Sequence, residues 1–257
     1  MSKIIALTNQ KGGVGKTTTA INLAAALGEA SLKVLLVDFD PQGNTTSGIV
    51  TNIKESQPTI YDLICGNASP EKCIMNEVST GVDLIPTDID LSGAEVELLR
   101  SKRGQLVLKE VLDPIKDDYD FIFIDCPPSI GVLTVNALTA ADSALIPVQC
   151  EYYALEGLNQ VLNTIEIVKQ KLNLDLTIEG ILFTMHDVRT RLSEEVVQSV
   201  KDNLDEYIFD TKIPRNIRLA EAPSYGMPII SYDSGSRGAE SYRLLAAELL
   251  NKLAGEN

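Results

Sequence analysis

The chain contains no tryptophan, one histidine and four cysteines among its 257 residues. Cys65, Cys73, Cys126 and Cys150 form no C-x-x-C pair, and His186 has no cysteine close to it in the sequence. This spacing is not that of a zinc or iron–sulfur site, and a disulfide framework is not expected in a chain of this length. We interpret all four cysteines as reduced, small hydrophobic residues.

Long apolar runs are also missing. No stretch approaches the ~20 consecutive apolar residues that a membrane-spanning helix needs. The apolar stretch at residues 4–7 is too short for a secretory signal, and no small-residue cleavage site follows it. We therefore expect a cytoplasmic protein without a membrane partner.

Positive charge is scarce, since 22 lysines and arginines face 36 acidic residues and the formal net charge is −14. This balance argues against a protein coated in basic surface. It leaves room for a local basic patch, because exposed charges act over only about 8–10 Å at ordinary salt. Six of the eight arginines lie after residue 185, although the net charge of that part of the chain is not positive.

Short apolar runs rich in Ile, Val, Leu and Phe alternate with helical patterns along the whole chain. Uninterrupted apolar runs are typical of strands that are covered on both faces. The alternation predicts an α/β fold, with a mainly parallel, twisted sheet and helices on both of its faces, in one domain over residues 1–257. The expected strands are 4–8, 34–37, 82–85, 121–124, 144–148 and 178–183, and the expected helices are 17–28, 91–112, 132–141, 155–172, 192–203 and 241–253.

A glycine-rich loop joins the first expected strand to the first expected helix. Its glycines allow backbone N–H groups to converge on phosphate oxygens, and the helix N-terminus adds a positive dipole end. Lys16 is placed to bridge the β- and γ-phosphates of a nucleotide, and the Thr17 hydroxyl is placed to bind Mg²⁺. The expected phosphate-binding residues are Lys11, Gly12, Gly13, Val14, Gly15, Lys16, Thr17 and Thr18.

This loop departs from two common patterns. Gln10 replaces the first glycine of G-x-x-x-x-G-K-[ST], and Thr18 replaces the last glycine of G-x-G-x-x-G. What remains is K-G-G-x-G-K-T-T, with a second lysine, Lys11, at its start. A glycine-rich turn that contains lysines by chance is the simpler alternative, and the strand before the loop and the helix after it disfavour it.

Acidic residues follow two of the expected strands where those strands end. Asp38 and Asp40 follow the strand at 34–37, and Asp125 follows the strand at 121–124. Carboxylates at the carboxyl ends of parallel strands face the crevice in which ligands bind, and an Asp there can hold Mg²⁺, usually through water. Such residues often only cap turns, but their joint occurrence beside a phosphate loop favours a metal site.

The loop resembles that of the deviant Walker A ATPases, and the rest of the chain narrows the resemblance to ParA/Soj proteins. The segments D-x-D-P-Q-G-N at 38–44 and D-C-P-P-S at 125–129 look like the two switch segments of that family. The stretches at 147–157, 184–191 and 213–226 are similar too, so that the resemblance covers residues 2 to about 250. It implies a dimer with two ATP molecules held between the subunits.

The resemblance also implies roles for single residues. Lys11 would reach the nucleotide of the partner subunit, and Asp40 would position or activate the attacking water. Asp38 and Asp125 would support Mg²⁺, and Pro214 and Asn216 would border the adenine. ATP would then join two subunits and hydrolysis would release them.

Partners are implied in the same way. ParA/Soj proteins bind double-stranded DNA without sequence preference as ATP dimers, and a ParB-type protein stimulates their hydrolysis. Arg189 and Arg218 match family positions that contact the phosphate backbone, and Arg215, Arg237 and Arg243 are weaker candidates. A nucleoid-associated protein is expected. The alternative is that these arginines form ordinary surface ion pairs with neighbouring acids.

Three rival functions belong to the same ATPase group. A MinD-like membrane ATPase needs a basic amphipathic C-terminal helix, whereas residues 244–257 contain one lysine and two glutamates. An electron-transfer protein like nitrogenase iron protein needs two cysteines per subunit at the dimer axis. Cys126 lies in the right motif region but in a buried-looking sequence context, and Cys150 lies at the end of an apolar strand. An ATPase that positions a protein complex as cargo stays open, as does the choice between chromosome and plasmid.

Overall fold

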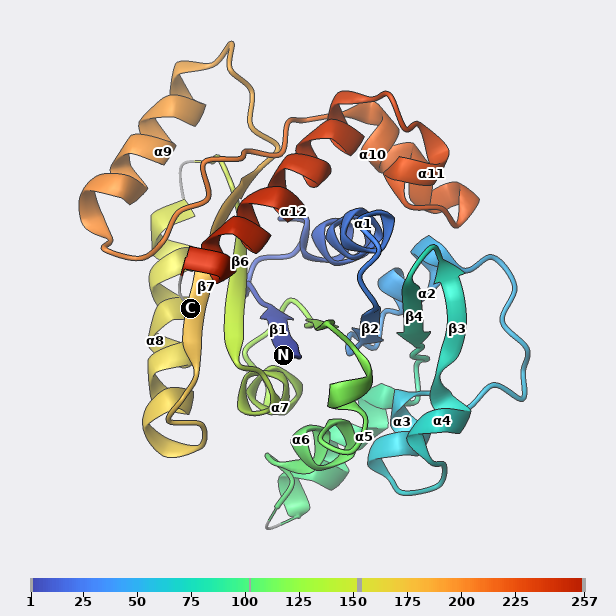
Figure 1. Ribbon diagram of the computed structural model, residues 1–257. Coiled ribbons are helices and arrows are strands. Elements are labelled where there is room, and N and C mark those ends of the chain that lie inside the picture. The colour runs from blue at the N-terminus through green and yellow to red at the C-terminus, as the bar shows by residue number, and fades with distance from the viewer. Residues whose placement is uncertain (1, 102, 152–153, 256–257) are drawn as a thin grey trace.

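The computed structural model describes residues 2–101, 103–151 and 154–255 (Figure 1). Its centre is a seven-stranded sheet in the order β3-β4-β2-β5-β1-β6-β7. Neighbouring strands run parallel, except that β3 is antiparallel to β4. The strands are β1 Lys3–Leu7, β2 Val34–Asp38, β3 Met75–Ser79, β4 Val82–Ile85, β5 Phe121–Asp125, β6 Ser143–Gln149 and β7 Thr177–Thr184.

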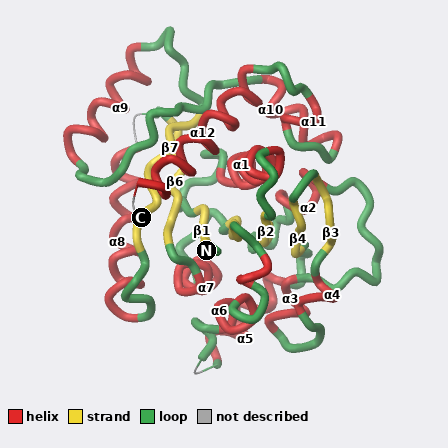
Figure 2. The backbone as a smooth tube through the Cα atoms, viewed as in Figure 1, coloured by secondary structure: helices red, strands yellow, loops and turns green. Residues whose placement is uncertain are grey.

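Helices pack on both faces of this sheet (Figure 2). The longer helices are α1 Lys16–Glu29, α5 Leu91–Arg100, α7 Val132–Ala140, α8 Ala154–Lys171, α9 Arg191–Asn203 and α12 Arg237–Gly255. The shorter ones are α2 Asn44–Ile49, α3 Ile60–Ile64, α4 Pro70–Cys73, α6 Val107–Leu112, α10 Ile217–Glu221 and α11 Ile229–Tyr232, with 3-10 turns at Lys116–Asp118 and Ala222–Tyr225.

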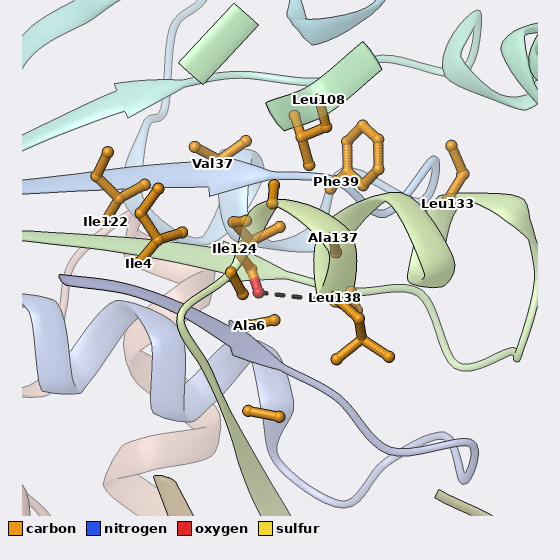
Figure 3. Close-up of a cluster of buried hydrophobic side chains, with 14 of the residues drawn as sticks. Ile4, Ala6, Val37, Phe39, Leu108, Ile122, Ile124, Leu133, Ala137 and Leu138 are labelled. Atoms are coloured by element: carbon orange, nitrogen blue, oxygen red, sulfur yellow. Dashed lines mark hydrogen bonds between the residues drawn. The ribbon is translucent and has the colours of Figure 1, made fainter. Parts of the chain in front are cut away.

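Two hydrophobic cores lie on opposite faces of the sheet because successive side chains of a strand point to opposite faces. In β1, Ile4 and Ala6 belong to the core covered by α7 and α8, and Ile5 and Leu7 belong to the core covered by α1 and α12. Figure 3 shows Ile4 and Ala6 in the first of these cores, beside side chains of β5 and α7. A strand that is buried on both faces must be apolar throughout, and this accounts for the uninterrupted runs in the sequence.

The predicted fold class is therefore confirmed. The strand register also places the carboxyl ends of β1, β2 and β5 side by side. Asp125 at the end of β5 is paired in register with Asp38 of β2 on one side and with Leu7 of β1 on the other. The loop after β1 begins directly beyond Leu7. The carboxyl edge of the sheet thus brings the glycine-rich loop and the acidic residues into one place.

The prediction of one helix over 91–112 is wrong, because two helices occupy this stretch. α5 ends at Arg100 and α6 begins at Val107. Gly104 lies between them, and a Cβ on it would come within 1.8 Å of the Leu98 carbonyl oxygen. The chain turns back so closely on α5 here that a continuous helix is impossible, which the apolar spacing of the sequence did not indicate.

The edge strand β3 and several short helices were not predicted. β3 reads Met-Asn-Glu-Val-Ser, and its Asn76 and Glu77 side chains are exposed, so that no apolar run marks it. α10 and α11 likewise lie in a stretch without helical periodicity in the sequence. The C-terminal helix begins at Arg237 rather than at residue 241.

A buried carboxylate ties the C-terminal helix to the sheet. Glu179 in β7 is fully buried and accepts a hydrogen bond of 2.6 Å from the Ser143 hydroxyl of β6. Its oxygens also lie 2.6 Å from the Lys3 ammonium and 2.9 Å from the Lys252 ammonium of α12. α12 is therefore a packed helix of the fold, and within the described ranges no helix has both the length and the apolar content needed to cross a membrane.

Gly28 provides a test of how closely α1 packs against the turn between β3 and β4. A Cβ at this position would lie 2.0 Å from the Thr80 carbonyl oxygen. Gly28→Ala should therefore lower the free energy of unfolding by about 2 kcal/mol or more, although alanine normally favours a helix. Urea unfolding of both proteins measures the difference.

The matched control is Gly157→Ala in α8, where a Cβ would meet no atom of the described residues within 4 Å. This change should raise the free energy of unfolding by about 0.5 kcal/mol. If Gly28→Ala were as stable as the unmodified chain, the close approach of α1 to the β3–β4 turn would be wrong.

Candidate nucleotide-binding site

The glycine-rich loop is held in an open turn by its own backbone and by two neighbouring strands. Gly13 and Gly15 have φ angles of 75° and 90°, in the region that residues with a side chain rarely adopt. The Asn9 amide donates a 2.7 Å hydrogen bond to the Pro147 carbonyl of β6, and the Thr184 hydroxyl donates one of 2.7 Å to the Val14 carbonyl. The loop is thus fixed from both ends before α1 begins at Lys16.

The two lysines of the loop have different surroundings. The Lys16 ammonium is buried and donates to the Lys11 backbone carbonyl at 3.3 Å. Burial lowers the pKa of Lys16, and the nearby carboxylates of Asp125 and Asp40 oppose this shift. The Lys11 side chain is about half exposed and forms an ion pair with Glu151, just beyond β6.

Asp125 lies at the centre of the site and leaves one oxygen free. Its Oδ2 accepts hydrogen bonds from the hydroxyls of Thr17 at 2.6 Å and Thr45 at 2.7 Å. Its Oδ1 is buried and has no hydrogen-bond partner among the residues that the structure describes. Burial raises the pKa of Asp125 to about 6, although the two hydroxyls and Lys16 act in the opposite direction.

This free oxygen is a test of whether the site suits a metal. A buried carboxylate oxygen needs a hydrogen-bond donor or a cation, and a hydrated Mg²⁺ supplies either contact. The Thr17 hydroxyl beside it is a further oxygen ligand of the kind that Mg²⁺ takes. The residues present therefore fit a magnesium ion at the start of α1.

Asp38 is fully engaged by the protein. Its Oδ2 accepts hydrogen bonds from the Thr46 backbone N–H at 2.7 Å and from the Thr46 hydroxyl at 2.6 Å. Its Oδ1 accepts from the Asp40 backbone N–H at 3.3 Å. Burial and the neighbouring Asp125 raise the pKa of Asp38 to about 7. Asp38 thus holds the loop that carries Asp40 in place. It would support a metal ion indirectly, through the residues around it.

Asp40 lies in the wall of a pocket over the phosphate loop. Its Oδ1 accepts a 3.0 Å hydrogen bond from the Gln42 backbone N–H, and only 5% of the residue is exposed. The pocket has a volume of about 590 Å³, and its floor includes Gly13, Lys16 and Thr17. Asp40 is therefore placed on the same side of the loop as the Asp125 cluster.

A second, smaller pocket of about 240 Å³ adjoins the first, and both include Gly15, Thr18 and Met185. Pro214 and Asn216 line this smaller pocket, so that the structure brings them to the phosphate loop. The Asn216 side chain also accepts a hydrogen bond of 2.8 Å from the Arg218 backbone N–H at the start of α10.

Several residues of the site were not identified from the sequence. Thr45 and Thr46 hold the two buried aspartates, and Thr184 and Asn9 hold the loop. Met185 lines both pockets and has a φ angle of 49°, which is rare for a residue with a side chain. Single polar residues carry no local pattern, so that no sequence signal could have identified them. Of the family-like stretch 147–157, residues 152 and 153 lie outside the described residues.

The arginines proposed as DNA contacts all have acidic neighbours. Arg189 forms two hydrogen bonds with Asp187, at 2.9 and 2.7 Å, and is largely exposed. Arg218 lies 2.9 Å from Glu221 and 3.4 Å from Asp233.

The weaker candidates divide into two groups. Arg215 and Arg237 line a surface pocket of about 880 Å³ together with Arg189. Arg243 instead forms an ion pair of 2.6 Å with Glu29 of α1. DNA contact by Arg189 and Arg218 stays a prediction.

Comparison with known proteins places this site in a family. Residues 2–178 match the family model described as an AAA domain. The chain is 53% identical over 249 residues to the sporulation initiation inhibitor protein Soj of Bacillus subtilis, covering 97% of this chain and 98% of that protein. It is 49% identical to the chromosome partitioning protein ParA of Myxococcus xanthus, covering 98% of this chain and 89% of the relative.

Among solved structures, the cobyrinic acid a,c-diamide synthase of Mycobacterium smegmatis with bound ADP and magnesium has a TM-score of 0.87 at 37% identity, covering 100% of this chain and 97% of that chain. The fold and the loop together define a P-loop ATPase with two lysines in its phosphate loop. The chain belongs to the ParA/Soj family of these ATPases.

The raised pKa of Asp38 predicts a pH dependence of stability. Between the ordinary carboxyl value near 4 and about 7, this group holds a proton in the folded chain and loses it in the unfolded chain. Its contribution to the free energy of unfolding should therefore fall as pH rises through this window, by on the order of 4 kcal/mol.

Urea unfolding of the ligand-free chain and of Asp38→Asn at several pH values measures this contribution together with the coupling between Asp38 and Asp125. We expect the stability of Asp38→Asn relative to the unmodified chain to increase from pH 4 to pH 7. A constant difference between the two proteins would show that Asp38 does not titrate in this range.

Proposed function

We propose that this chain binds ATP with Mg²⁺ and acts as a nucleotide-switched partitioning protein on chromosome or plasmid DNA. The observation that carries the proposal is the buried Asp125, which joins Thr17 and Thr45 and keeps one oxygen free beside the phosphate loop. The names of the relatives, Soj and chromosome partitioning protein ParA, support the biological part.

The chain's own groups suit phosphoryl transfer, which depends on positioning and on neutralising charge more than on covalent chemistry. The loop N–H groups and the buried Lys16 would bind the phosphates. Thr17 and Asp125, with Asp38 behind them, would hold Mg²⁺, whose charge offsets that of the phosphate oxygens. Asp40 would orient the attacking water from the pocket wall.

The smaller pocket would take the base of the nucleotide. Ile213, Pro214 and Leu219 give it apolar walls, and Asn216 adds an amide to the polar groups of Thr18, Thr184, Arg215 and Tyr242. Apolar walls with a few polar groups suit the flat ring and polar edge of adenine. We therefore propose that Pro214 and Asn216 contact the adenine.

Lys11 is the residue that would require a second subunit. Its exposed side chain pairs with Glu151 and is not among the residues that line the pocket of its own subunit. In an ATP-bound homodimer, Lys11 would contact the triphosphate of the partner subunit. Both subunits would then be needed to neutralise the charge that develops during hydrolysis.

DNA binding would involve Arg189 and Arg218. Arg189 and Arg218 would have to exchange their carboxylate partners, Asp187 and Glu221, for DNA phosphates, and this should make binding weak for one subunit and sensitive to salt. A dimer doubles the number of contacts and makes affinity depend on nucleotide state. Binding to DNA would place the chain on the nucleoid, and a ParB-type protein would stimulate hydrolysis and so release the DNA.

Lys11→Ala tests the switch. We expect this variant to bind ATP normally, because Lys11 does not line the pocket, but to lose ATP-dependent dimerisation and at least about 90% of its hydrolysis. Sedimentation with ADP and with ATP, together with phosphate release, measures these quantities.

Two further variants provide the controls. Lys16→Ala should lose nucleotide binding itself, and Asp40→Ala should form a stable dimer with ATP because hydrolysis no longer separates the subunits. Unchanged dimerisation and turnover in Lys11→Ala would leave only a generic nucleotide-binding protein.

Arg189→Ala and Arg218→Ala test the DNA surface. Each should weaken binding of the ATP-bound protein to random-sequence duplex DNA by about three- to tenfold and reduce its salt dependence, since one phosphate contact is lost. Fluorescence anisotropy at several salt concentrations measures both effects. Arg103→Ala is the control, because this exposed arginine pairs with Glu110 and belongs to no proposed surface; equal affinities in all three variants would refute the assignment.

A further inference from the structure

The outer face of α5 carries an exposed apolar stripe. Ile89, Val96 and Leu99 are 73%, 51% and 73% exposed, whereas Leu91 and Leu98 point into the core. Positions seven and three residues apart share one side of a helix, and Ile89 lies in the turn that leads into α5, where its carbonyl accepts from the Ser92 N–H at 3.0 Å. Val96 and Leu99 therefore share the side of α5 opposite its buried side, with Ile89 in the turn before the helix, and we name these three residues the α5 stripe.

Acidic residues flank the α5 stripe on both sides. Asp88 and Glu95 lie one position before Ile89 and Val96, and Asp90 and Glu97 lie one position after them. A shift of one position turns by about 100° around a helix axis, so that Glu95 and Glu97 border opposite edges of the stripe at Val96, and Asp88 and Asp90 flank Ile89 in the turn before α5. Within residues 2–101, 103–151 and 154–255, none of these four carboxylates forms an ion pair with a lysine or arginine.

We propose that the α5 stripe is the docking site for a segment of the ParB-type partner in which apolar residues are flanked by basic ones. Such a segment would cover the apolar side chains and bring cations to both acidic edges. This inference rests on the proposed function, in which a partner protein stimulates hydrolysis.

The α5 stripe lies next to both loops that carry the acidic residues of the site. Thr87, two residues before Ile89, donates its backbone N–H to the Thr46 hydroxyl at 3.1 Å, and that hydroxyl in turn donates to Asp38.

At the other loop, a Cβ built on Gly131 would lie 3.6 Å from a Glu95 carboxylate oxygen. Gly131 closes the loop that begins after Asp125. A partner seated on α5 would thus press on a segment that is hydrogen-bonded to Thr46 of α2 and that passes close to Gly131. This arrangement gives the partner a physical route to the rate of hydrolysis.

The test replaces the stripe without touching the nucleotide site. In Val96→Ser/Leu99→Ser, the concentration of ParB-type protein from the same genome that gives half-maximal ATPase stimulation should rise about tenfold. Asp90→Asn/Glu97→Gln should raise it as well and should make stimulation less sensitive to salt. Basal hydrolysis, ATP-dependent dimerisation and DNA binding should not change in either variant.

Ile167→Ser/Leu174→Ser is the matched control, because these side chains are 45% and 77% exposed and lie outside α5. It should be stimulated like the unmodified chain. Normal stimulation of both α5 variants would overturn the docking site alone, and loss of dimerisation in them would assign the stripe to a second copy of this chain. If the partner fails to stimulate even the unmodified chain, the partner role in the proposed function fails, and this inference fails with it.

Discussion

The site depends on two carboxyl groups that are buried side by side at the carboxyl ends of β2 and β5. Asp38 and Asp125 are paired in register, and burial raises the pKa of both. One buried ammonium, that of Lys16, lies near them. Burying charge is costly unless it is compensated, and threonine hydroxyls compensate only part of it here. A divalent cation is the partner that this arrangement fits.

The same constraint explains how rigidly the surrounding loops are held. Thr17 at the start of α1 and Thr45 at the start of α2 both donate to one oxygen of Asp125. The phosphate loop and the loop that carries Asp40 are therefore connected through a single carboxylate. Any change in charge at that carboxylate reaches both loops, which is the property that a nucleotide-dependent switch requires.

The exposed charged groups around the carboxyl edge of the sheet are of two kinds. Lys11 and the arginines near α10 are cations paired with carboxylates of their own chain, and such exposed pairs are weak enough to be exchanged for phosphates. The acidic edges of α5 lack such partners in the described part of the chain. In a chain with a net charge of −14, the surface thus separates groups that suit phosphates from groups that suit a basic protein segment.

The sequence by itself determined the α/β class, the phosphate loop and the acidic residues after β2 and β5, because strands buried on both faces and glycine-rich turns impose local patterns. It did not determine the break between α5 and α6, the edge strand β3, or the roles of Thr45, Thr46 and Thr184. These depend on contacts between residues far apart in the chain, such as the approach of Gly104 to Leu98 or of Thr184 to Val14. Only the tertiary structure decides them, since packing and long-range hydrogen bonds leave no periodic signal in the sequence.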